Sequence, residues 1–329
     1  MARTHASYYD YSPSQPAAGV FAALFGLAFL VTLFQAIRTR AWIWLVMVFA
    51  IAMETVGYGA RVASAGDVYG RTIYIIQFVC IILAPVFMAG IIYVVFGRIA
   101  FHVVPPESRT VKLLWIPARW ITPIFVGFDI FALLLQLVGA VMISATQVTD
   151  KNAKDKLTKG KDIANAGVTL QIAAFGLFTF VAARFHFVSK RFRASLESKF
   201  VPVPNSKFVT MEGDERRFRP KWRLLLYVVN LSCIMIVIRS IYREIDFRLG
   251  RDGGYVSTHE WLLYALDAAP IFLCCAGFNV FTPGDFVPMG WRQPKAKAVD
   301  QTSEVDLETM STARIVNNGH STQSRGSVE

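Results

Sequence analysis

The sequence predicts an all-α, polytopic membrane protein built as a bundle of seven transmembrane helices. Two observations support this fold class. Hydrophobic residues make up 54% of the 329 positions and charged residues only 17%, which is too apolar for water-soluble domains of this length. The apolar residues are also gathered in runs of about 20, the length at which a helix crosses the hydrocarbon core of a bilayer. The net charge of +11 therefore indicates which loops face the cytoplasm, and we expect no nucleic-acid partner.

The first three spans are predicted at 17–37, 41–60 and 73–97. The first contains no charged residue, and the tail before it lacks the basic segment of a secretory signal. The second is apolar except for Glu54 near its centre. The third carries Pro85 at mid-span, where the missing backbone N–H permits a kink.

The remaining four spans are less uniform but long enough to cross a bilayer. The fourth contains a single charged residue, Asp129, and the fifth follows a lysine-rich segment at 151–162 that we expect to be an outer loop. The four cysteines of the chain fall inside apolar runs, which is typical of core residues rather than of a disulfide framework. These spans are predicted at 121–144, 165–188, 222–242 and 258–282.

The lysines and arginines between the spans predict the orientation. Most of them lie at 38–40, 98–120, 184–221 and after 283. By the positive-inside rule these segments are cytoplasmic, which places the N-terminus outside and the C-terminus inside. The segment after the last span is rich in Ser, Thr, Asn and Gly and shows no apolar periodicity. We therefore expect an extracellular tail at 1–16, a transmembrane domain at 17–288 and a disordered cytoplasmic tail at 289–329.

Three spans carry polar residues at the spacing i, i+4, i+7, which places them on one helix face. An ionised carboxylate in the bilayer costs roughly 2.5 to 3.5 kcal/mol on insertion scales unless it is neutralised. Because the three stripes bear opposite charges, we expect them to neutralise one another across helices in the outer half of the bundle. The stripes are Glu54, Tyr58 and Arg61; Arg239, Arg243 and Asp246, with Glu244 adjacent; and Glu260, Tyr264 and Asp267.

Further polar residues lie within the third, fourth and fifth spans. Gln77, Gln136 and Gln171 are at a depth similar to that of the stripes, and Asp129 is deeper, toward the cytoplasmic half. We predict that these residues and the stripes bind substrate or couple protons. The alternative is a structural role, in which the same residues only fix helix packing.

Several chemistries are disfavoured by the motifs. The chain has no GxxxxGK[ST] phosphate loop, no HExxH zinc motif and no lysine in the seventh span for a retinal Schiff base. Its five histidines are isolated. We therefore predict a protein that is not an enzyme, with no catalytic residue, no cofactor and no metal site.

Six motifs between about residues 17 and 288 resemble, in order and spacing, the fungal RTA-like family of seven-span proteins, also called the lipid-translocating exporter family. The resemblance implies a plasma-membrane or endomembrane protein linked to the movement of, or resistance to, amphiphiles such as sphingoid long-chain bases and aminosterols. The motifs are ExxGYxxR at 54–61, QxxxxxxAPxxxxxxxY at 77–93, DxxxxxxQxxG at 129–139, RSIYREID at 239–246, HEWLLYALDAAP at 259–270 and TPG at 282–284.

The leading hypothesis is an ATP-independent translocator or exporter of amphipathic lipids or cationic amphiphiles that confers resistance to toxic lipids. Its partners are membrane lipids or amphiphilic small molecules, whose ammonium headgroup Glu54, Asp129 or Asp267 would neutralise. If transport is uphill, Glu54 or Asp267 would couple it to protons. The alternative is a seven-span receptor or lipid sensor with a cytoplasmic regulatory partner at 189–221 or on the C-terminal tail. A membrane scaffold is a third interpretation, and the oligomeric state is left open.

Overall fold

The computed structural model describes residues 14–66, 71–103, 118–145, 153–191, 200–202, 208–211, 219–249 and 259–287. The predicted cytoplasmic tail at 289–329, most of the predicted outer tail and most of the connection at 189–221 lie outside the described residues. The chain divides into Met1–Arg292 and Gln293–Glu329, and only the first of these units contains described residues.

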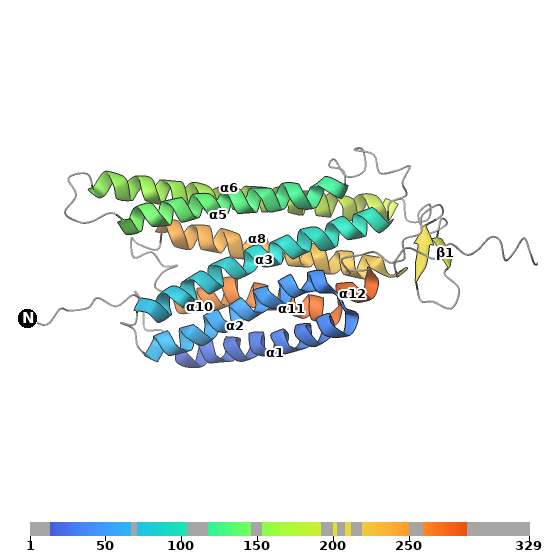
Figure 1. The fold of residues 1–329 in the computed structure, drawn as a ribbon, viewed down its shortest axis with the longest axis horizontal. Helices are drawn as coiled ribbons and strands as arrows, with labels where there is room; N and C mark the ends of the chain where they lie inside the picture. The colour runs from blue at the N-terminus through green and yellow to red at the C-terminus, as the bar shows by residue number, and fades with distance from the viewer. Residues whose placement is uncertain are drawn as a thin grey trace, which may run out of the picture. The chain divides into compact units, whose positions relative to one another are not determined.

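Seven helices in the described part of the chain are long and apolar enough to cross a membrane, which confirms the predicted all-α, seven-span fold. Figure 1 shows them running along a common direction, with α5 beside α6 and α1 beside α2. The seventh span is composite, because a π-helix, η3, interrupts it. The helices are α1 (Gln15–Thr39), η1 with α2 (Trp42–Trp44, Leu45–Gly66), α3 (Arg71–Val103), α5 (Ala118–Ala145), α6 (Ala153–Arg191), α8 (Trp222–Leu249), and α10, η3, α11 and α12 (Glu260–Leu263, Tyr264–Ala268, Ala269–Val280, Pro283–Phe286).

The structure corrects two details of the prediction. Helix α6 begins at Ala153, so most of the lysine-rich segment at 151–162 is helix rather than loop. Ala and Lys favour helices, and Asp155 in the first turn interacts favourably with the helix dipole. The second detail is a short antiparallel hairpin in which β1 (Phe200–Pro202) pairs with β2 (Val209–Met211) inside the long connection at 184–221.

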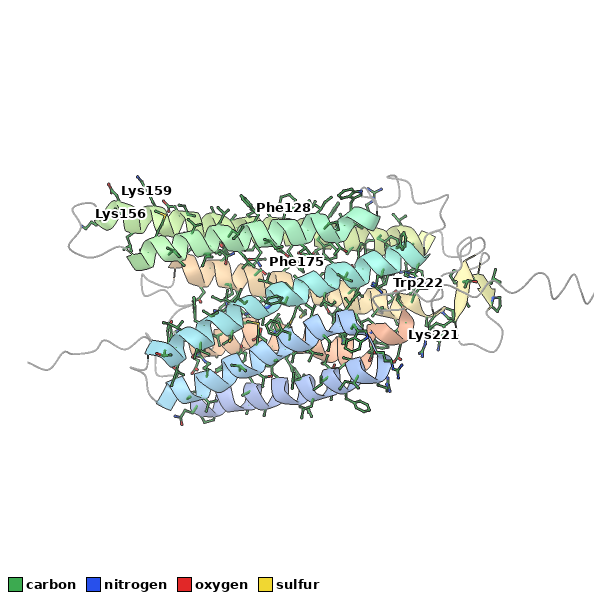
Figure 2. All side chains as sticks on the ribbon, in the orientation of Figure 1. Phe128, Lys156, Lys159, Phe175, Lys221 and Trp222 are labelled. Carbon is green, nitrogen blue, oxygen red and sulfur yellow. The ribbon has the colours of Figure 1, made fainter. Side chains whose placement is uncertain are left out.

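Apolar side chains face outward as well as inward, as expected of helices surrounded by lipid. Phe128 on α5 is 44% exposed and points away from the bundle, whereas Phe175 on α6 is buried and faces inward (Figure 2). Lys156 and Lys159 lie at one end of the helices and Lys221 at the other (Figure 2). The charged ends and the apolar middle are the distribution that a bilayer requires.

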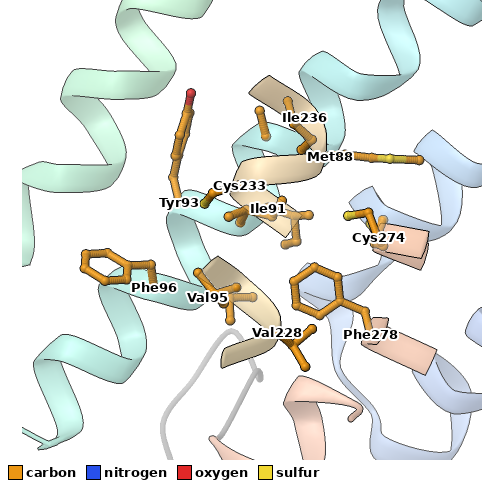
Figure 3. Packing of buried hydrophobic residues seen from close by; sticks show 14 of the residues in the cluster. Met88, Ile91, Tyr93, Val95, Phe96, Val228, Cys233, Ile236, Cys274 and Phe278 are labelled. Atoms are coloured by element: carbon orange, nitrogen blue, oxygen red, sulfur yellow. The ribbon is translucent and has the colours of Figure 1, made fainter. Parts of the chain in front are cut away.

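Two structural features position the functional residues. Helices α3, α8 and α11 pack through an apolar core that includes Met88, Cys233 and Phe278 (Figure 3). Helices α5 and α6 pack closely through glycines: a Cβ added to Gly139 would lie 2.5 Å from the carbonyl oxygen of Gly160. Small residues at such a contact let two membrane helices approach backbone to backbone.

Candidate functional site

Four charged side chains from three helices meet inside the bundle, and we call them the charge cluster: Glu54, Arg239, Arg243 and Asp267. Arg239 donates from Nε to Asp267 Oδ1 at 2.6 Å and from Nη1 to Glu54 Oε1 at 3.3 Å. Arg243 donates to both carboxylate oxygens of Asp267, at 2.8 and 2.5 Å. Glu54, Arg239 and Asp267 are at most 3% exposed. Two positive and two negative charges balance, so the cluster is neutral as a whole.

A proline in α3 supplies the third acceptor for Arg239. Pro85 has no N–H, so the carbonyl of Ile81, four residues earlier, lacks its helical donor. Arg239 Nη2 donates to that carbonyl at 2.5 Å. The approach of α3 depends on Gly57 of α2, because a Cβ at this position would lie 2.6 Å from the Ile81 side chain. The backbone carbonyl that Pro85 frees in α3 is thus part of the site.

Asp267 lies in the π-helix η3, between Leu263 and Ala269. The N–H of Ala269 bonds to the carbonyl of Tyr264, five residues earlier. A π turn rotates the side chains that follow it relative to a regular α-helix, and such turns are frequent at functional sites. Here the turn coincides with the residue that binds both arginines of α8.

A second polar group forms between the stripe of α2 and the stripe of the seventh span, closer to the helix ends. Arg61 Nη2 donates to Glu260 Oε1 at 3.0 Å, and Arg61 Nε donates to the Tyr264 hydroxyl at 3.2 Å. That hydroxyl donates to Glu260 Oε1 at 3.0 Å. The other oxygen of Glu260 accepts the backbone N–H of Ser14, the N-cap residue of α1. This group therefore connects α2, the seventh span and the start of the first.

Tyr58 lies on α2 between the two polar groups, one turn after Glu54. Its ring stacks on Phe25 of α1 at 5.3 Å, and the ring of Tyr264 stacks on Phe21 at the same distance. The Tyr58 hydroxyl is buried and has no hydrogen-bond partner among the described residues. Two phenylalanines of α1 thus cover the tyrosines of the α2 stripe and the seventh-span stripe.

Asp246 borders the charge cluster, with a carboxylate oxygen 4.0 Å from Arg243 Nη1, whereas other predicted site residues make contacts elsewhere. Gln136 Nε2 donates to Gln171 Oε1 at 3.0 Å across the α5–α6 contact. Glu244 accepts from Arg248 at 2.5 Å and from Thr169 of α6 at 2.9 Å. Gln77 is buried on α3, one turn before Ile81.

Asp129 is also separate, on α5. It is 3% exposed, and neither carboxylate oxygen has a hydrogen-bond partner among the described residues. The Tyr93 hydroxyl of α3 lies beside this carboxyl group without forming a hydrogen bond of good geometry.

The stripe residues were predicted from spacing, and the structure brings them together across helices. The carbonyl of Ile81 and the backbone of Ser14 are the contributors that sequence reasoning missed. The signal for Ile81 was present, because a mid-span proline always frees the carbonyl four residues earlier. Tyr93 is the last residue of the motif at 77–93 but was not among the predicted site residues.

Three proteins from Saccharomyces cerevisiae are similar to this chain in sequence. Protein RTA1 is 29% identical over 308 residues, covering 86% of this chain and 87% of the relative. Protoporphyrin uptake protein 1 is 32% identical over 228 residues, covering 69% and 64%. Sphingoid long-chain base transporter RSB1 is 26% identical over 276 residues, covering 79% and 69%.

The model of the family described as RTA1 like protein matches residues 47–289, which include every predicted site residue. No solved structure gives a significant match.

Proposed function

We propose that this chain, which belongs to the family of RTA1 like proteins, is an ATP-independent translocator or exporter of amphipathic lipids or cationic amphiphiles. Two of its relatives are named for the transport of sphingoid long-chain bases and the uptake of protoporphyrin, which supports a role in moving amphiphiles. The chain itself is a multi-pass membrane protein. We further propose the plasma membrane as its location and resistance to toxic lipids as its physiological effect.

The charge cluster is the observation that carries this proposal. Charges buried at membrane depth are expensive, and they mark substrate or ion pathways in transporters. Glu54, Arg239 and Asp267 connect the second, sixth and seventh spans through bonds that exist only while these helices keep one arrangement. An ammonium headgroup that competes for a carboxylate would release an arginine and let the helices rearrange.

Glu54 is the carboxylate best suited to exchange. Its contact with Arg239 is 3.3 Å, whereas Asp267 accepts three bonds of 2.5 to 2.8 Å from two arginines. Loss of the Glu54 contact leaves Arg239 still bound to Asp267 and to the Ile81 carbonyl. We therefore propose that Glu54 binds the headgroup or a coupling proton, and that Asp267 holds the arginines in position.

Liposomes containing the purified protein test this function. The transbilayer movement of a fluorescent sphingoid base is followed with and without a pH gradient, for the wild type, Glu54→Gln and the exposed control Asp155→Asn. We expect flux above that of protein-free liposomes, a reduction of roughly tenfold or more in Glu54→Gln because a charged contact is lost, and no change in the control. Wild-type flux in a correctly folded Glu54→Gln protein would contradict the assignment of Glu54.

A lipid sensor is the second candidate function. The β1–β2 hairpin gives the long basic connection a folded segment to which a cytoplasmic regulatory partner would bind. Specific binding of the sphingoid base by the reconstituted wild type, with no flux under either condition, would favour this function over transport.

A further inference from the structure

Asp129 differs from the other buried carboxylates of the described residues. Glu54 and Asp267 are both paired with arginines inside the charge cluster. Asp129 is as deeply buried, yet within the described part of the chain neither of its oxygens accepts a hydrogen bond and it takes part in no ion pair. An ionised carboxylate left in that state costs several kcal/mol. Among the described residues, no charged side chain cancels the charge that Asp129 would carry when ionised.

The Tyr93 ring beside Asp129 belongs to a group of packed aromatic rings. Phe125, one turn earlier on α5, packs 5.5 Å from the ring of Tyr93 and 5.3 Å from that of Phe178. Tyr93 also packs 4.5 Å from Phe178 and 5.8 Å from Phe175. Figure 3 shows Tyr93 extending from α3 with its hydroxyl directed away from the apolar core between α3 and α8. We call the rings of Tyr93, Phe125, Phe175 and Phe178 the aromatic cluster.

The titratable groups around Asp129 are few. The Tyr93 phenol faces it from α3, and the Cys233 thiol of α8 lies near that phenol. On α6, the aromatic cluster contributes Phe175 and Phe178, neither of which carries a charge. A carboxylate near aromatic rings is a combination that binds ammonium groups, because the rings attract a cation electrostatically and the carboxylate neutralises it.

Taken together with the proposed function, on which this inference rests, the geometry points to Asp129 and the aromatic cluster as an exchange site that holds a proton when empty and an ammonium headgroup when loaded. On loading, the carboxyl O–H bond breaks and its proton passes to water, while the carboxylate pairs with the cation. One positive charge replaces another, so the buried site is neutral in both states. The exchange would couple the entry of a cationic amphiphile to the release of a proton.

The outer surface of α5 accommodates the tail of such a ligand. Phe128 and Ile130, on either side of Asp129 in the chain, are 44% and 54% exposed. Phe131 and Leu134 are exposed as well, so this face of α5 is apolar and open to lipid. A hydrocarbon chain can therefore remain in the bilayer against this face of α5 while its headgroup binds Asp129.

Isothermal titration calorimetry on the purified full-length protein tests the exchange. The probe is dodecyltrimethylammonium below its micellar concentration, because a quaternary ammonium has no proton of its own to lose, and dodecanol is the uncharged comparison. Titrations in buffers of different ionisation enthalpy report the number of protons released. We expect about one proton released per bound cation in the wild type, because a single carboxyl group exchanges, and none on binding dodecanol.

Asp129→Asn and the exposed Asp155→Asn separate the specific effect from a general one. Asp129→Asn is expected to abolish proton release and weaken cation binding at least about tenfold, leaving dodecanol binding unchanged; Asp155→Asn behaves as the wild type. Unchanged cation binding in a monodisperse Asp129→Asn protein would overturn the inference. So would wild-type protein that fails to bind the cation or binds it without releasing a proton, a result that needs no variant.

The sphingoid-base flux assay distinguishes the two proposals. Flux that depends on Glu54 but is unchanged in Asp129→Asn would support the translocator function and contradict the exchange site at Asp129. Proton release that depends on Asp129 in a protein without flux would retain the site and move the function to sensing.

Discussion

Arg239 shows how one residue of α8 binds three other spans. Its guanidinium donates to Asp267, to Glu54 and to the backbone carbonyl of Ile81. The planar fork of arginine reaches all three acceptors at once, which the single ammonium of lysine does less well. Without Arg239, Glu54 would lose its arginine and the Ile81 carbonyl would lose its donor in the interior of the bundle.

Arg239→Met is therefore expected to destabilise the protein by about 3 to 5 kcal/mol, the usual cost of breaking a buried ion pair from one side. Thermal unfolding of the detergent-purified protein measures the effect. Arg38→Met is the matched control, since Arg38 pairs with Asp285 at 3.3 Å while remaining 54% exposed. Equal melting temperatures for the two variants would show that the charge cluster does not stabilise the fold.

At the scale of elements, the contact between α5 and α6 is made by small residues. Cβ atoms added to Gly139 and Gly167 would lie 2.5 Å from the Gly160 carbonyl oxygen and 2.7 Å from that of Ala132. These neighbours are backbone atoms, which cannot move as a side chain can. The short separation also places Gln136 within bonding distance of Gln171.

Gly139→Ala is expected to lower the free energy of unfolding by about 1 to 3 kcal/mol, because overpacking forces the two backbones apart. Gly127→Ala on the same helix is the control, since a Cβ at that position meets nothing within 4 Å. The midpoint of thermal unfolding should fall in the first variant and stay the same or rise in the second. The reverse order would contradict the close α5–α6 contact.

At the scale of the whole molecule, the distribution of positive charge predicts how the seven spans are oriented. Most of the lysines and arginines lie in alternate connections, although the lysine-rich segment at 151–162 is an exception, and alternate connections of a helix bundle lie on the same side of a membrane. With an odd number of spans, the two termini then lie on opposite sides. If the predicted orientation holds, the Arg61 and Glu260 group lies near the outer end of the bundle and the β1–β2 hairpin on the cytoplasmic side.

Epitope tags at the two termini test this orientation. On intact cells we expect antibody to label a tag before Met1 and to reach a tag after Glu329 only once the cells are permeabilised. Expression at the cell surface is checked in the same experiment by biotinylation. Labelling of the C-terminal tag alone on intact cells would show the opposite orientation. The charge cluster would then lie closer to the cytoplasmic side of the membrane.

The sequence by itself determined the seven spans and which polar side chains share a helix face. Hydropathy and the i, i+4, i+7 spacing are properties of one segment, so they need no knowledge of its neighbours. This reasoning grouped Glu54 with Arg61 and placed Arg239 beside Arg243. It missed the start of α6, which is too polar to extend the apolar run, and the β1–β2 hairpin, whose strands of three residues are too short to give a pattern.

Only the tertiary structure decided which charges meet. The rotation and depth of each helix relative to the next depend on packing among residues distant in sequence, such as Gly57 against Ile81. That packing joined Arg239 to the carbonyl freed by Pro85 and left Asp129 without an ion pair among the described residues. A spacing rule describes one helix face at a time, whereas neutralising a buried charge requires a partner from another helix.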